Sequence, residues 1–268
     1  MKKYNYVVTG LLILFAIVMV FPIYLLFLSS LRTPAHVFDT NVLPSYLTLQ
    51  NFVEALGNGF ANAIKVSFIV AVSVTVIALF FHSMSGYALA RFDFPGKKFI
   101  FGWMLSTLMV PFGVIIIPLF MITKAMGMTN SYAGLIIPSI FNAYGIFLFR
   151  QFYNDLPEEL EEASYMEGCS YAGTFFRIAL PLSKPVIIPL AIAFFLANWN
   201  NYLWPIIVNQ KQELWVVQVA LANLMGSAYS TPWPTILASA VIAALPTFVL
   251  FFALQKYLVE GIKMTGIK

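Results

Sequence analysis

The sequence predicts an all-α membrane protein: a bundle of six transmembrane helices with both chain ends in the cytoplasm. Of its 268 residues, 60% are hydrophobic and only 10% are charged. This composition is typical of polytopic membrane proteins and excludes a large soluble domain. Six apolar stretches of about 20 residues match a hydrocarbon core about 30 Å thick. The predicted spans are approximately 7–31, 64–90, 99–122, 133–152, 186–208 and 236–254.

The first apolar stretch is interpreted as a retained span. It follows Lys2 and Lys3, carries no charge, and ends before Arg32. Its length exceeds the core of a secretory signal, which is only about 7–15 residues. Two outer segments separate the spans, at 33–60 and 209–234, and a short surface helix is expected at about 47–56 within the first. The chain 1–268 is expected to form a single transmembrane domain.

The positive charges orient the predicted bundle. Eleven of the 15 lysines and arginines lie on the side of the chain ends, and four lie on the other side. Because positive residues accumulate on the cytoplasmic side, both termini and the loop 154–185 are placed in the cytoplasm. Cys169, the single cysteine, lies in this loop, so no internal disulfide is possible. The net charge of +4 therefore reflects topology and does not indicate nucleic-acid binding.

The cytoplasmic loop, residues 154–185, is the most acidic part of the chain. Two short helices are expected in it. Asp155 is predicted to cap the first, and Gly168 to end it, because glycine accepts the left-handed conformation of a C-terminal cap. Ser170 is predicted to cap the second helix, which runs to Pro181. The loop holds six of the chain's eleven carboxylates: Asp155, Glu158, Glu159, Glu161, Glu162 and Glu167.

The same loop carries a motif at fixed spacing. Glu162-Ala163-Ser164 is followed by Gly168, and after nine intervening residues by Ile178 and Leu180-Pro181. This pattern resembles the EAA motif of bacterial ABC importer permeases, with Ser164 in place of the second alanine. The segment 198–208 and the tail 255–268 resemble the carbohydrate-type permeases, and the chain as a whole is most similar to maltose-type second permease subunits.

The resemblance implies a hetero-oligomeric importer in the bacterial plasma membrane. Such a permease pairs with a homologous second permease and two cytoplasmic ABC ATPase subunits, and an extracytoplasmic solute-binding protein delivers the substrate. ATP and Mg would be bound by the partner ATPase, and this chain would carry no cofactor, metal or catalytic residue. The expected cargo is a sugar, an oligosaccharide or a glycerol-phosphate-like solute, moved by alternating access.

The resemblance also assigns the coupling residues. Glu162 would pair with an ATPase arginine, and Ala163 with Ser164 would form a small-residue face that sits in a cleft of the ATPase. The tail is expected to reach the ATPase as well. The residues expected to couple to the ATPase are Glu161, Glu162, Ala163, Ser164, Glu167 and Gly168.

Polar residues within the spans suggest a substrate path. Asn198, Asn201 and Tyr202 are spaced to share one face of a helix, while Asn142 and Tyr144 fall near the middle of the membrane. Polar groups at this depth usually face the bundle interior or an aqueous path. Two alternatives remain open for the first group: hydrogen bonds between helices, and an aromatic belt at the membrane interface.

The prolines and the histidine within the predicted spans allow structural explanations as well as functional ones. Pro111, Pro118 and Pro138 predict either helices broken around a gate or simply bent helices. His82 is predicted to be a span histidine satisfied by its neighbours.

Two other classes of function, an ion-coupled carrier and a membrane-embedded enzyme, would require residues that the predicted spans do not contain. An ion-coupled secondary carrier would need ionisable groups within its spans, and no aspartate or glutamate lies in any predicted span. A membrane-embedded enzyme would need a similar cluster. The chain contains no phosphate-binding loop of the Walker A type, so ATP hydrolysis would need a separate subunit.

Overall fold

A computed structural model describes residues 6–265 except 40, 44 and 228–230, with side chains described as far as residue 253. The regular elements in this part of the chain are all helices, joined by loops, and the described residues form no strand beyond one isolated bridge between Arg32 and Leu47. The chain divides into two compact units, Met1–Ile64 with Val217–Pro246, and Lys65–Val216 with Thr247–Lys268.

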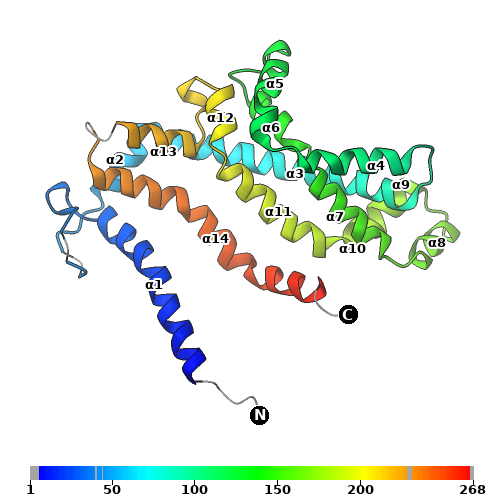
Figure 1. The fold of residues 1–268 in the computed structure, drawn as a ribbon, viewed down its shortest axis with the longest axis horizontal. Helices are drawn as coiled ribbons and strands as arrows, with labels where there is room; N and C mark the ends of the chain where they lie inside the picture. Colours follow the sequence, from blue (N-terminus) through cyan, green and yellow to red (C-terminus); the bar gives the residue numbers. More distant parts are fainter. Residues whose placement is uncertain (1–5, 40, 44, 228–230, 266–268) are drawn as a thin grey trace. The chain divides into compact units, whose positions relative to one another are not determined.

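Three of the predicted spans are continuous helices (Figure 1). They are α1 (Tyr6–Ser30), α3 (Ala61–Arg91) and α14 (Trp233–Thr265). The spans predicted at 7–31, 64–90 and 236–254 are therefore confirmed as long apolar helices. The helix α14 extends beyond 254, so residues expected to form a separate tail continue the last helix.

The other three predicted spans are broken. Broken helices were one of the two alternatives predicted from Pro111, Pro118 and Pro138. Residues 99–122 form α4 (Lys97–Ser106) with η3 (Thr107–Met109) and then α5 (Phe112–Ala125), bent by 108°. Pro111 lies at this bend with extended backbone, because proline cannot donate the hydrogen bond that would continue the helix. If each bent pair counts as one crossing, the described residues contain up to six spans.

The second broken span divides into α6 (Tyr132–Ile140) and α7 (Ala143–Asn154), with a 43° bend. Both residues between them, Phe141 and Asn142, have extended backbone. The third predicted span, 186–208, forms α11 (Lys184–Trp199) and α12 (Leu203–Val208), which are separated by residues 200–202. The third bent pair that is apolar enough to cross a membrane is a different one, Tyr171–Leu182 with Lys184–Trp199, bent by 74°. Each break leaves backbone groups that no helix satisfies, so polar side chains are needed at these places.

The first unit also contains the outer segments. They form η1 (Pro34–His36), α2 (Gln50–Ala55) with the π-helical turn η2 (Leu56–Phe60), and the ten-residue helix α13 (Val217–Gly226). The surface helix expected at 47–56 is thus observed at 50–60. The helix α13 was not predicted. Buried Asn51 ties α2 to the end of α1, since its amide donates to the carbonyls of Ser30 and Arg32, each at 2.8 Å.

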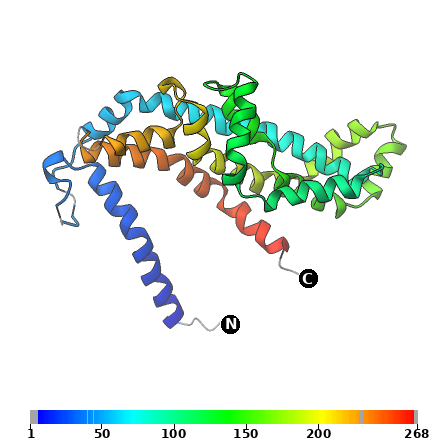
Figure 2. The same ribbon diagram turned by 45° about the horizontal axis from the view of Figure 1, so that its top comes forward.

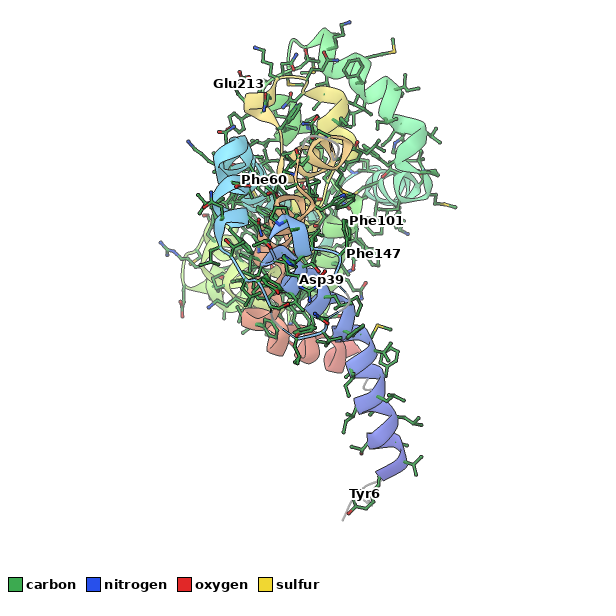
Figure 3. All side chains as sticks on the ribbon, turned by 90° about the vertical axis from the view of Figure 1, so that its left-hand side faces the viewer. Tyr6, Asp39, Phe60, Phe101, Phe147 and Glu213 are labelled. Carbon is green, nitrogen blue, oxygen red and sulfur yellow. The ribbon has the colours of Figure 1, made fainter. Side chains whose placement is uncertain are left out.

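The second unit is built around α3 and α7. They cross closely at Gly86, where an added Cβ would lie 2.5 Å from the Cβ of Phe149. The helix α4 packs on α7 through Phe101 and Phe147, whose rings stack with centroids 6.4 Å apart (Figure 3). Within this unit, α8 and α9 lie at one end of α3, away from α5, α6 and α12 (Figures 1 and 2).

Candidate coupling loop and substrate cavity

The first helix of the loop 154–185 is α8 (Glu159–Met166). Its N-cap position is held by Glu158, and Asp155 instead closes the C-terminus of α7, so the predicted capping role of Asp155 is wrong. The reason is that α7 continues to Asn154, so Asp155 keeps helical backbone and its N–H bonds back to α7 carbonyls. Three glutamates in the first turn still favour the start of α8, because its N-terminus is the positive end of the helix dipole.

Gly168 ends α8 as predicted. It has a φ of +83°, and the N–H of Cys169 bonds to the Ser164 carbonyl at 3.0 Å. This geometry is a Schellman cap, which needs a left-handed residue. Ser170 also caps the second helical run as predicted, since its hydroxyl accepts the N–H of Gly173 at 3.2 Å. That run comprises α9 (Tyr171–Thr174), η4 (Phe175–Ala179) and α10 (Leu180–Leu182).

A buried ion pair fastens α8 to the end of α3. Arg91 Nε lies 2.7 Å from Glu161 Oε1, and the two side chains are only 9% and 7% exposed. The Tyr87 hydroxyl donates to Glu161 Oε2 at 2.9 Å, and Arg91 Nη2 donates to the Leu156 carbonyl at 2.6 Å. We call Tyr87, Arg91 and Glu161 the anchor cluster. Tyr87 and Arg91 were not predicted from the sequence, because no local pattern links them to Glu161, which is 74 and 70 positions away.

The motif residues of α8 divide between two faces. Ser164 is buried, and its hydroxyl lies 2.6 Å from Thr174 Oγ1, which joins α8 to α9. Glu162, Ala163 and Glu167 are exposed, and so is Met166. The outward small-residue face expected from Ala163 with Ser164 does not form, because successive helical residues point about 100° apart.

A cavity of about 310 Å³ lies in the second unit, between α3, α5, α6, α11 and the start of α12. Three of the five residues predicted for the substrate path line it, namely Asn142, Asn198 and Asn201. The rest of the lining is apolar apart from Ser139 and the indole of Trp204, and it contains no charged side chain. Tyr144 and Tyr202 do not line it and are 49% and 42% exposed.

Asn142 is positioned by the break between α6 and α7. Its side-chain oxygen accepts the N–H of Tyr144 at 2.9 Å, and its own N–H donates to Nε2 of His82 at 3.1 Å. His82 is fully buried, and its Nδ1 has no partner among the described residues. The prediction that neighbours satisfy His82 therefore holds for Nε2 and is wrong for Nδ1.

Asn198 and Asn201 reach the cavity from the break between α11 and α12. Asn198 donates to the carbonyl of Phe194 at 2.8 Å, and Asn201 accepts the N–H of Trp204 at 3.4 Å. The single helical face predicted for Asn198, Asn201 and Tyr202 is wrong, because the α-helix ends at Trp199. A tight turn, closed by a 3.3 Å bond from Asn201 N to the Asn198 carbonyl, still brings the two amides to one cavity.

The two tryptophans beside these amides are packing residues. Trp199 stacks on Phe195 with centroids 5.8 Å apart, and Trp204 Nε1 donates to the Gly134 carbonyl at 2.9 Å. Both are almost fully buried, which is incompatible with an aromatic belt facing the membrane interface. The described residues contain no group of three or more histidine, cysteine, aspartate or glutamate side chains able to hold a metal ion.

Comparison with known proteins identifies the family. Residues 82–264 match the family of binding-protein-dependent transport system inner membrane components. The chain belongs to this family. It is therefore a permease subunit of a binding-protein-dependent ABC importer in the inner membrane, a transporter component and not an enzyme. This assignment replaces the alternatives of an ion-coupled carrier and a membrane-embedded enzyme.

The permease resembles characterised relatives over nearly its whole length. It is 34% identical to the arabinooligosaccharides transport system permease protein AraQ of Halalkalibacterium halodurans, across 94% of this chain and 92% of the relative. It is 33% identical to the protein of that name from Bacillus subtilis, across 99% and 96%. It is 32% identical to the sn-glycerol-3-phosphate transport system permease protein UgpE of Brucella abortus, across 95% and 94%.

The fold of the permease also matches a solved structure. A chain from the crystal structure of a bacterial ABC transporter involved in the import of the acidic polysaccharide alginate superposes with a TM-score of 0.85. The match covers 96% of both chains at 22% sequence identity, so it concerns the fold alone.

Proposed function

We propose that this permease imports a neutral sugar or oligosaccharide through the cavity lined by Asn142, Asn198 and Asn201. The convergence of three amides on one cavity carries the proposal. An amide both donates and accepts hydrogen bonds, as sugar hydroxyls do. The volume of about 310 Å³ falls at the lower end of ligand pockets, which span about 300–1,000 Å³.

The charge of the cavity favours a sugar over a phosphate ester. A phosphate buried without a cation loses its hydration at great cost, and none of the described lysines and arginines lines this cavity. The arabinooligosaccharide permeases are therefore better guides to the cargo than the glycerol-3-phosphate permeases. Uptake of radiolabelled arabinotriose compared with sn-glycerol-3-phosphate, by the assembled transporter with its binding protein, separates the two classes.

The energy for transport would come from partner subunits. In this proposal two cytoplasmic ATPase subunits bind ATP and Mg, a homologous second permease completes the path, and an extracytoplasmic binding protein delivers the sugar. Residues 1–268 form one transmembrane domain in contact with membrane lipid, with both termini in the cytoplasm. The tail 255–268 would also touch the ATPase, but its side chains lie outside the described residues.

The exposed face of α8 would dock on the ATPase. Glu162, Ala163, Met166 and Glu167 supply this face, and the turn at Gly168 directs the chain back to the spans. Glu162 would pair with an ATPase cation, which contributes strongly only if the pair is desolvated and hydrogen-bonded. Glu161 and Ser164 point away from this face and hold α8 on its own chain.

Charge reversal at Glu162 tests this function. Tagged permease is purified from membranes with its partners, and the bound proteins are identified by mass spectrometry. Wild type is expected to retain a nucleotide-binding ATPase and a second permease. Glu162→Lys is expected to insert at the same level, keep the second permease, and lose both the ATPase and sugar uptake.

Asp155→Lys is the matched control, because it makes the same charge change at an exposed position outside α8. It is expected to retain the ATPase. Uptake at the wild-type rate by Glu162→Lys would refute the docking role, and a wild-type chain that purifies without any ATPase would refute the proposed function itself.

A further inference from the structure

The anchor cluster joins α8 to α3 through a buried and fully hydrogen-bonded ion pair, a stronger attachment than a surface loop needs. Its central carboxylate accepts from Arg91 on one oxygen and from Tyr87 on the other, at 2.7 and 2.9 Å. Glu161 is 5% exposed and Arg91 is 2.7 Å away with a side chain 9% exposed. A charged pair buried in this way is stable only with such complete hydrogen bonding, and it resists separation because either charge alone would be left desolvated.

The same cluster collects the other elements of the loop. Arg91 Nη2 holds the Leu156 carbonyl at 2.6 Å, which fixes the segment between α7 and α8. The Tyr87 ring packs on Tyr153 of α7 and on Phe175 of η4, with centroids 5.4 and 5.2 Å apart. Tyr87, Tyr153 and Phe175 belong to the hydrophobic core of the second unit. A displacement of α8 therefore cannot be absorbed locally, since its contacts lead into a close-packed core.

We infer that the anchor cluster is the attachment through which α8 moves α3, with Arg91 and Tyr87 as positioning residues for transport. The inference rests on the proposed docking of α8, and it separates two tasks within one short helix. The exposed face holds the ATPase, while the buried face transmits its movement to a span. Packed side chains, hydrogen-bond networks and rigid helices of this kind carry coupling between distant sites.

The position of α3 explains why this attachment matters for the cargo. The same helix that carries Tyr87 and Arg91 also carries Ala78, which lines the cavity, and His82, which holds the N–H of Asn142. A shift or rotation of α3 at its cytoplasmic end is therefore communicated to the cavity by a single continuous helix. Loss of the anchor is expected to leave the ATPase docked and active while the span no longer follows.

The test measures movement of α3 directly, without knowledge of the cargo. A spin label is attached at Met84→Cys, an exposed position of α3, in a Cys169→Ser background. The complete transporter is placed in lipid nanodiscs, and the spectrum of the label is recorded with and without the ATP analogue AMP-PNP. Bound ATPase is quantified in the same sample, together with its ATP hydrolysis.

Glu161→Gln is expected to retain the ATPase and its hydrolysis but to reduce the AMP-PNP-dependent change of the label by about fivefold or more, the lower end of typical coupling between sites. Glu158→Gln is the matched control. Glu158 lies 3.5 Å from Arg91 but is 79% exposed, and exposed pairs contribute little. Its label change is expected to equal that of wild type.

Two results would overturn the inference. One is an undiminished label change in Glu161→Gln, and the other is loss of the ATPase from that variant, which would assign the cluster to building the docking face. If Glu161→Gln does not accumulate in the membrane, Tyr87→Phe decides, because it removes one hydrogen bond and leaves the ion pair. Tyr87→Phe is expected to bind the ATPase fully and to give a smaller label change, and an unchanged label would refute the transmitting role. Failure of the wild-type chain to bind an ATPase would instead refute the proposed function.

Discussion

Gly145 shows how tightly single residues control the region behind the cavity. An added Cβ at this position would overlap the ring of His82 and lie 2.8 Å from Cζ of Phe194. His82 in turn accepts the N–H of Asn142. Because His82 is fully buried, it has no free space into which to retreat. The position of an amide on the cavity wall thus depends on the absence of one methyl group.

Gly145→Ala is therefore expected to be destabilising by about 1–3 kcal/mol, the usual cost of overpacking a core. Thermal unfolding of the detergent-solubilised protein measures it. Gly102→Ala is the matched control, since no atom lies within 4 Å of its added Cβ, and alanine at this helical site is expected to stabilise by about 1 kcal/mol. Equal melting temperatures for the two variants would contradict the close packing described here.

At the scale of elements, the helix breaks decide where polar groups reach the cavity. The break between α6 and α7 presents Asn142, and the break between α11 and α12 presents Asn201 next to Asn198 in the last turn of α11. Each side-chain amide makes a hydrogen bond to the backbone of a residue two to four positions away, and this bond fixes one end of the amide. Broken helices in a membrane are tolerated where they line a cavity, so these breaks agree with a substrate path.

The double variant Asn198→Ala with Asn201→Ala tests this path. Its KM for sugar uptake is expected to rise by about thirtyfold, because two hydrogen bonds of about 1 kcal/mol each sum to about 2 kcal/mol, while the amount of bound ATPase stays constant. Gln151→Ala is the control, because it removes an exposed amide at the far end of α7. Unchanged uptake kinetics in the double variant would show that the sugar does not bind in this cavity.

The topology proposed for the whole molecule rests on its charge distribution. Eleven of the 15 basic residues fall on the side assigned to the cytoplasm. That side includes the loop 154–185, in which Met166 of α8 is 88% exposed. If the loop docks on a cytoplasmic ATPase, Met166 must be accessible from the cytoplasm and from nowhere else.

A single-cysteine protein tests this orientation. Met166→Cys in a Cys169→Ser background is expected to react with a membrane-impermeant maleimide in inside-out vesicles but not in intact cells. The Cys169→Ser protein alone serves as the blank, since Cys169 is the chain's only cysteine. Labelling of intact cells would place the loop outside and reverse the topology.

Composition, charge and short motifs were enough to predict the class of the protein and the residues that cap the helices of its loop. Composition and charge are sums over the chain, so they need no knowledge of packing to predict a multispan membrane protein. Caps depend on a few neighbouring residues, which is why Gly168 and Ser170 could be assigned correctly. Asp155 failed because two helices compete for one short segment, and local pattern does not say which of them extends.

The contacts between polar residues that are distant in sequence could be identified only from the packing of the helices. The pairing of Arg91 with Glu161 spans 70 positions, and the meeting of His82 with Asn142 spans 60. No periodicity encodes such pairs, because they arise when helices distant in sequence pack against each other. The same holds for the cavity, where a break moved Tyr202 off the expected helical face while a tight turn kept Asn198 and Asn201 together. Helical spacing predicts neighbours only while the helix continues, and in this chain the functional groups stand where it stops.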